Sequence, residues 1–431
     1  MAAGPNQAVI FTYQVGFGDC FLLRFRYPQR DRHVLVDFGT TQMPDGTGAD
    51  PLVAIARDIA EKCNGVLDVV VVTHRHADHL SGFTRNTRGT GPGDIIRALK
   101  PRLVIQPWTE RPDLAVDATG PEPATRSART RRFAAALDSM QSIAQQVHEL
   151  VQGPEMRRFA PAIREQLAFL GQDNLTNRSA VENLMTMGAR NAYVSFGARV
   201  ALGRVLPGVK AHVLGPATLQ QSAAIRSQRT RDPAEFWQLQ QQRLSDEGSL
   251  ALDRQVLFPD RPYVAGGKLP FSSRWLAQRL RSARGEQLLE LVRTLDNALN
   301  NTSVILLLEA GRKKLLFPGD AQIENWAYAL GQAKIRKLLA GVDVYKVGHH
   351  GSLNATPKTM WGLFSKRATT ARRGRLTTLL STLPGKHGTD GSNTEVPRRT
   401  LLRALQAESD LHSTHLLPGG VLLEEVTIPL T

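Results

Sequence analysis

A His-rich segment directly after an apolar run constrains this chain more than any other feature. Residues 67–73 are apolar and β-branched apart from one Asp, and residues 74–79 read His-Arg-His-Ala-Asp-His. So uniform a run is typical of a strand covered on both faces. With 11 His in 431 residues, three His and one Asp reach these places by accident in fewer than about one such chain in a thousand. The sequence therefore predicts a buried strand that delivers His74 at its end.

The residue types and spacing of this segment point to metal binding. His74 and His76 are two positions apart on extended backbone, so they can face the same side and bind one ion. Asp78 and His79 follow in the turn, where they would hold a second ion. Imidazole nitrogen and carboxylate oxygen are ligands that zinc, manganese and iron share. A turn of surface histidines is the weaker alternative.

Two later segments offer further ligands. Residues 315–320 form an apolar strand that ends in Gly-Asp, which puts Asp320 at a strand tip where it would bridge both ions. Residues 342–347 form another strand, followed by Gly-His-His-Gly-Ser at 348–352. Alone, a strand-end Asp is more often a turn former, and a His pair is more often a surface feature. Together with residues 74–79, they favour a two-ion site.

Strand and helix patterns divide the chain into three parts. Residues 1–83 and 205–431 carry the strand signals, with a helical insert at about 217–299, and residues 84–204 read as a mainly helical, basic insertion. Strands are expected at 8–15, 20–25, 33–37, 67–73, 210–214, 303–309, 314–317, 342–347, 376–381 and near Val421. Helices are expected at 51–63 with Asp50 as cap, 126–151, 233–244, 272–299 and 397–407. This order indicates two sheet halves packed together and covered by helices, an α/β fold.

The charge balance bears on possible partners. Lys and Arg number 54 against 39 Asp and Glu, which gives a net charge of +15. Such a surplus favours phosphate-containing or nucleic-acid partners, and a solvated basic surface explains it equally well. Aromatic residues make up 6% of the chain, too few to indicate a base-stacking platform. The candidate phosphate contacts are Arg129, Arg131, Arg132, Arg372 and Arg373.

The remaining composition indicates a soluble cytoplasmic protein. The chain has two cysteines, Cys20 and Cys63, too few for a disulfide framework. No stretch approaches the roughly 18 apolar residues of a membrane span, and the N-terminal residues lack the pattern of a secretion signal.

Six segments, in this order, resemble the metallo-β-lactamase-fold hydrolases. They are Val-Gly-Phe-Gly-Asp (15–19), Leu-Val-Asp-Phe-Gly (35–39), Thr-His-Arg-His-Ala-Asp-His (73–79), Asn-Thr-Ser-Val (301–304), Phe-Pro-Gly-Asp (317–320) and Lys-Val-Gly-His-His-Gly-Ser (346–352). The closest likeness is to the soluble metallohydrolase domain of ComEC-type DNA-uptake proteins and their stand-alone relatives. It covers about residues 8–85 and 205–410.

The resemblance implies an αββα four-layer sandwich with a two-ion site, zinc first and manganese or iron as alternatives. By position, His74 and His76 bind the first ion, Asp78 and His79 bind the second, and Asp320 bridges. One residue of His349 and His350 completes the second site. We favour His350 as the ligand and His349 as a substrate or proton-transfer group, so that Asp78 and His349 are the expected catalytic residues. The resemblance makes Asp19, Asp37 and Ser352 residues that orient the ligands and loops.

This sequence departs from the family at two places. Gly215 stands where the family usually supplies another His to the first site, and His212 would point to the opposite face of its strand. Val396 stands where relatives often carry His before Pro397. The first site is therefore expected to be the weaker one.

The implied reaction is hydrolysis by metal-activated water, without a protein nucleophile. A phosphodiester or nucleic-acid substrate is the first expectation, because of the charge and the likeness to a DNA-handling protein. A small ester, lactone or amide is the second. A metal-poor scaffold that binds nucleic acid or a partner protein is the third.

Overall fold

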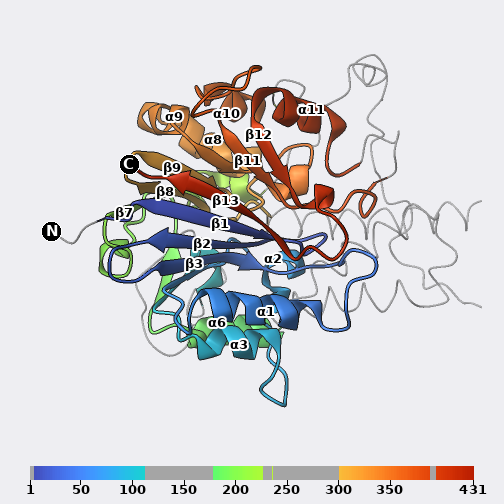
Figure 1. The fold of residues 1–431 in the computed structure, drawn as a ribbon. Coiled ribbons are helices and arrows are strands. Elements are labelled where there is room, and N and C mark those ends of the chain that lie inside the picture. Colours follow the sequence, from blue (N-terminus) through green and yellow to red (C-terminus); the bar gives the residue numbers. More distant parts are fainter. Residues whose placement is uncertain (1–3, 112–177, 227–234, 236–299, 389–394) are drawn as a thin grey trace, which may run out of the picture.

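The structure is a computed structural model that describes residues 4–111, 178–226, 235, 300–388 and 395–431. These residues form two mixed sheets with helices (Figure 1). The first sheet has the order β13 (Leu423–Pro429), β1 (Gln7–Tyr13), β2 (Cys20–Arg26), β3 (Arg32–Phe38), β4 (Val69–Val71), β5 (Leu103–Pro107), β6 (Asn191–Val194). The second has the order β12 (Asp410–Ser413), β11 (Thr377–Leu380), β10 (Val344–Lys346), β9 (Lys313–Phe317), β8 (Ile305–Ala310), β7 (Val209–Gly215).

Strand direction places the chemistry-bearing segments at one edge. In the first sheet β3, β4, β5 and β6 run parallel, and in the second β9, β10, β11 and β12 run parallel. The carboxyl ends of parallel strands meet at a shared edge, where α/β proteins commonly bind ligands. Residues 74–79 follow β4, and Asp320 and His350 follow β9 and β10.

The helices lie in two groups, one beside each sheet (Figure 1). Beside the first sheet are α1 (Pro51–Lys62), α3 (Pro92–Ala98) and α6 (Arg178–Met187), and beside the second are α8 (Ile323–Gly331), α9 (Ala333–Ala340), α10 (Lys358–Leu363) and α11 (Arg399–Glu408). The short α2 (Ala77–Leu80) follows β4. Single-turn 3-10 helices are η1 (Ser81–Phe83), η2 (Trp108–Glu110), η4 (Leu202–Arg204), η5 (Ala223–Arg226), η8 (His349–Gly351) and η9 (Thr414–Leu416).

Three apolar cores hold these elements together. The central core combines residues of both sheets, and Phe21 of β2 contacts Phe317 of β9 edge-on with 5.9 Å between ring centroids. A second core joins the first sheet to Ile55 and Ile59 of α1, and a third joins the second sheet to Trp326 of α8. Burying each such side chain contributes about 1.5–3 kcal/mol. The sheets therefore face each other, and the helices cover apolar faces of each sheet.

Several elements differ from the sequence predictions. β5 and β6 lie inside residues 84–204, which were predicted to be mainly helical, and they continue the first sheet. β5 is a five-residue buried strand without polar alternation, a pattern that periodicity alone cannot separate from a helix segment. β12, α8, α9 and α10 were also missed. The expected helices at 126–151 and 272–299, and that at 233–244 apart from residue 235, lie outside the described residues.

The start of α1 and its N-cap residue were predicted correctly. Asp50 is the N-cap residue, yet its side chain makes no capping hydrogen bond. Pro51 at the first helical position fixes the backbone angle φ that the helix needs, so the helix starts there without the side-chain cap.

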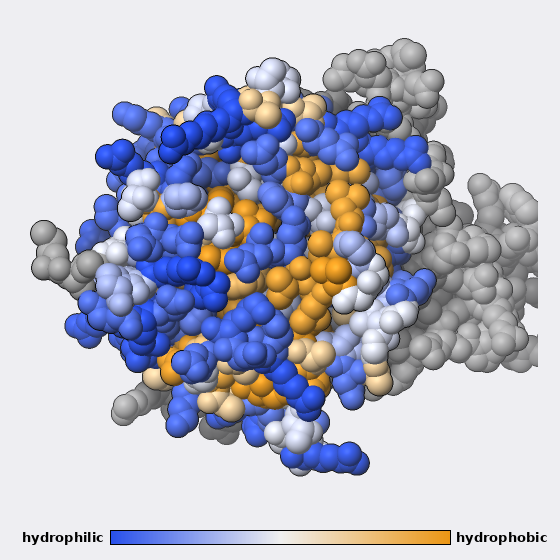
Figure 2. All heavy atoms as spheres, in the orientation of Figure 1, coloured by the Kyte–Doolittle hydropathy of each residue, from blue (hydrophilic) through white to orange (hydrophobic). Residues whose placement is uncertain are grey.

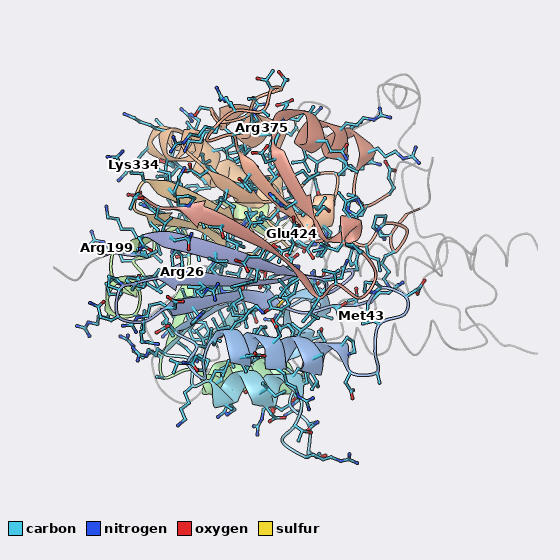
Figure 3. The ribbon with its side chains drawn as sticks, viewed as in Figure 1. Arg26, Met43, Arg199, Lys334, Arg375 and Glu424 are labelled. Atoms are coloured by element: carbon cyan, nitrogen blue, oxygen red, sulfur yellow. The ribbon has the colours of Figure 1, made fainter. Side chains whose placement is uncertain are left out.

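Exposed basic side chains are found far from α2. Figure 2 shows hydrophilic residues spread over much of the visible face, with apolar side chains between them. Arg26, Arg199 and Lys334 are exposed and lie toward the end of the molecule away from α2 (Figures 1 and 3).

Within the described ranges, no helix combines the length and apolar character that crossing a bilayer requires.

Candidate metal centre

Four buried ligand atoms surround a space of the size of one metal ion. His79 Nε2 lies 3.1 Å from Asp320 Oδ2 and 3.7 Å from Asp78 Oδ2. His350 Nε2 lies 2.7 Å from Asp78 Oδ2 and 3.9 Å from Asp320 Oδ2. Tetrahedral zinc with bonds of about 2.0–2.1 Å places neighbouring ligand atoms roughly 3.3 Å apart. The four distances fall on either side of that value, so this four-residue group fits a tetrahedral ion.

Burial and unsatisfied atoms strengthen the fit. All four side chains are at most 2% exposed. Asp78 Oδ1, His79 Nε2 and Asp320 Oδ2 are buried atoms with no hydrogen bond of acceptable geometry among the described residues. Buried polar atoms are nearly always satisfied, and exceptions point to a missing ion or water. The residues present therefore fit a bound divalent cation.

A second group of ligands shares Asp78 with the first. His74, His76 and Asp78 bring ligand atoms within 4.8 Å of one another, and His74 Nε2 lies 3.0 Å from His76 Nδ1. We expected Asp320 to bridge the two ions. Asp78 is common to this three-residue group and the four-residue group, Asp320 belongs only to the latter, and a bridging role of Asp320 stays a prediction.

Hydrogen bonds at the far side of each imidazole orient it for binding. His350 Nδ1 lies 3.1 Å from the Ser381 carbonyl, and His79 Nδ1 lies 2.9 Å from Asp37 Oδ2. Both partners only accept, so each Nδ1 carries a proton and each Nε2 faces the ligand group. Thr73 Oγ1 donates to Asp37 Oδ2 at 2.8 Å and lies 3.1 Å from His74 Nδ1.

Asp19 and Asp37 lie beside imidazoles of the four-residue group. Asp37 accepts from the Thr73 N–H at 2.7 Å and also contacts His79. Asp19 Oδ2 lies 3.6 Å from His79 Nδ1, and Asp19 Oδ1 lies 3.7 Å from His350 Nδ1. Both carboxylates therefore support imidazoles of the four-residue group.

Close backbone contact between the two N-terminal motifs and α2 requires a glycine at position 39. The Asp19 N–H donates to the Asp78 carbonyl at 2.9 Å, and the Gly39 N–H donates to the Asp19 carbonyl at 3.0 Å. A Cβ on Gly39 would lie 2.5 Å from both Asp78 C and His79 N. Only glycine allows the loop after β3 to approach α2 this closely.

The cluster's charges stabilise one another. Burial disfavours charge on Asp78, but His79 and His350 outweigh it and hold the pKa of Asp78 below its usual range. Burial likewise opposes charge on His79, and the surrounding carboxylates raise its pKa well above the usual value. The pKa of His350 is also raised, against burial, by Asp78, Asp320 and Asp19. Without metal, protons therefore occupy imidazoles that an ion needs.

Zinc binding should consequently release protons and weaken as the pH falls. The raised pKa values of His79 and His350 mean that proton competition begins above about pH 6.5, the usual His value. We expect roughly one to two protons released per ion bound to the four-residue group at pH 7. Calorimetric titration in two buffers of different ionisation enthalpy measures this number. Identical heats in both buffers would contradict the prediction.

The two consecutive histidines have different positions. His350 is fully buried within the four-residue group. The His349 side chain is 24% exposed, and its Nε2 lies 3.8 Å from Asp320 Oδ2. Its backbone N–H donates to Asp320 Oδ1 at 3.1 Å. Both residues have positive φ, 45° and 52°, in a region that costs energy and clusters at functional sites. The roles that we favoured for the two residues stay predictions.

Ser352 contacts the turn of the two histidines through its backbone. Its N–H donates to the His349 carbonyl at 2.8 Å, which closes the turn. Its Oγ is buried and has no hydrogen bond among the described residues.

Side chains pack closely against Gly215. A Cβ there would lie 2.6 Å from Asn325 Oδ1 and 2.8 Å from Ile305 Cδ1. His212 is no substitute, because its Nε2 lies 3.2 Å from Glu309 at a partly exposed position on β7. Among the described residues, the three-residue group therefore lacks a third imidazole.

The two described members of the predicted phosphate contacts, Arg372 and Arg373, lie away from the ligand groups. Arg372 and Arg373 are exposed in the loop before β11, at the amino ends of strands whose carboxyl ends carry the ligands. Figure 3 shows Arg375 of the same loop near the helices beside the second sheet. Arg129, Arg131 and Arg132 lie outside the described residues.

Sequence reasoning missed two buried ion pairs at the site. Arg75 forms a bidentate pair with Glu110, with both contacts at 2.9 Å, and so ties the ligand segment to η2. Lys346, at the end of β10, contacts Asp19. The sequence signal that could have indicated the second pair is a lysine at the end of a strand whose other residues are mostly apolar.

No family model matches this chain, and no curated protein matches it.

Proposed function

We propose that this protein is a metal-dependent hydrolase of the αββα metallo-β-lactamase fold that cleaves phosphodiesters of the nucleic-acid type. One observation carries the proposal: two buried groups of His and Asp ligands share Asp78 at the edge where both sheets end. The three apolar cores support the four-layer arrangement, since they lie between the sheets and between each sheet and its helices.

We assign the site residues two roles, metal binding and proton transfer. Asp78, His79, Asp320 and His350 would hold one ion, and His74 and His76 with Asp78 would hold the other. Their nitrogen and oxygen donors and their spacing favour zinc. Divalent ions, when bound, supply a water of lowered pKa and positive charge for the phosphoryl oxygens. His349 is the partly exposed imidazole of the 348–352 turn, so we assign it the proton transfer to the leaving group.

The substrate class rests on charge. The net charge of +15 attracts polyanions at long range. The low aromatic content argues for backbone rather than base recognition. Cys20 and Cys63 are both buried and unpaired, which supports our assignment of the protein to the reducing cytoplasm.

A substrate panel tests the proposal. Purified protein with zinc or manganese is incubated with single- and double-stranded DNA, RNA and a bis-aryl phosphodiester, beside a lactone and an ester panel. We expect phosphodiester cleavage above a His76→Ala control. Cleavage confined to lactones or esters would show that the substrate is a small ester or lactone and not a phosphodiester. The absence of bound metal after reconstitution would favour a binding scaffold.

A further inference from the structure

A buried lysine lies directly behind the four-residue group. Lys346 is the last residue of β10 and is 2% exposed. Its Nζ contacts the Asp19 carboxylate, lies 3.6 Å from Asp320 Oδ1 and donates to the Gly319 carbonyl at 3.4 Å. Lysine is among the residues least often buried, so this placement calls for an explanation.

The buried ammonium has two anionic partners. The Asp19 carboxylate contacts Lys346 Nζ, and Asp320 Oδ1 lies 3.6 Å from it. A buried ammonium requires such partners, because it loses its hydration. Lys346 therefore offsets part of the negative charge of the four buried carboxylates Asp19, Asp37, Asp78 and Asp320.

The two oxygens of Asp320 have different surroundings. Oδ1 accepts from the His349 N–H at 3.1 Å and faces Lys346. Oδ2 faces the imidazoles of His79 and His350. The cation on one side thus fixes which oxygen is turned toward the ligand group.

Asp19 extends the influence of Lys346 to two more ligands. The carboxylate that binds Lys346 lies 3.6 Å from His79 Nδ1 and 3.7 Å from His350 Nδ1. We propose that Lys346 is a positioning residue which, directly and through Asp19, holds Asp320, His79 and His350 in their metal-binding orientation. This inference rests on metal binding by the proposed hydrolase, and on no particular substrate.

Zinc affinity of the whole protein tests the inference. Lys346→Met should weaken zinc binding to the four-residue group by roughly 10- to 100-fold, the usual effect of losing a residue behind the ligands. Competition with a chromophoric zinc chelator measures the affinity without any substrate. Lys313→Met is the matched control, because Lys313 lies at the opposite end of β9 and its partner Asp343 keeps Lys366 at 2.7 Å. The control should bind zinc like the wild type.

A second variant separates positioning from folding. Lys346→Met alone leaves Asp19 buried without its cation, so the double variant Asp19→Asn with Lys346→Met removes both charges and should fold more readily. We expect its zinc affinity to stay low, because Asp320 Oδ1 still lacks the lysine. Wild-type or tighter zinc binding by either folded variant would overturn the inference. If the wild type itself binds no zinc, the proposed function fails and this inference fails with it.

Discussion

Asp78→Asn should abolish zinc binding and hydrolysis together. Asp78 is the residue that belongs to both ligand groups, so its replacement removes an anionic ligand from each. Without an ion, the pKa of water returns from about 7 to near 16. We therefore expect activity to fall by more than about 10³-fold and bound zinc to fall to the background of the elemental analysis.

The fold itself should survive this substitution. Asparagine has nearly the shape of aspartate, so the packing is kept. The substitution removes a charge that His79 and His350 stabilise, so the metal-free variant should be less stable than the wild type but still folded. Thermal unfolding in the presence of a chelator checks this point. Asp343→Asn is the matched control, because Asp343 is also buried but pairs with Lys313 and Lys366 away from the cluster. Asp78→Asn protein that retained wild-type zinc would remove Asp78 from the centre.

The candidate metal centre could be located from the sequence because the buried strands that precede its ligands can be recognised. A β-branched apolar run indicates a buried parallel strand, and His74 follows such a run. Asp320 and the 349–350 pair also follow apolar strands, and β9 and β10 are parallel neighbours. Residues at the carboxyl ends of parallel strands are brought to one edge, so three distant segments could be assigned to one site.

Tertiary packing decided what the sequence could not. Which carboxylate belongs to both groups depends on how the two sheets are placed against each other, and the described residues place Asp78 in both. Lys346 was overlooked because a lysine near a strand end normally reads as an exposed residue. Its burial depends on Asp19, which lies 327 positions earlier in the chain. The short strands β5 and β6 were missed because their residues carry no decisive periodicity.

The two ligand groups should bind zinc with unequal affinity. The four-residue group has a complete tetrahedral set, whereas among the described residues the three-residue group has two imidazoles and the Asp78 carboxylate that it shares with the four-residue group. Loss of a residue that merely supports a ligand weakens metal binding by roughly 10- to 100-fold, so a missing direct ligand should weaken it at least as much. Zinc titration of the wild type should therefore show one tight ion and a second that binds at least about 100-fold more weakly.

Single substitutions assign the tight ion to its group. His350→Ala should remove the tight ion, because it deletes a ligand that faces both Asp78 and Asp320. His74→Ala should leave the tight ion in place and abolish only the weak one, since His74 belongs to the three-residue group alone. His212→Ala is the control and should leave both, because His212 pairs with Glu309 on β7. Two equally tight ions in the wild type, or loss of the tight ion in His74→Ala, would contradict the assignment of the tight ion to the four-residue group.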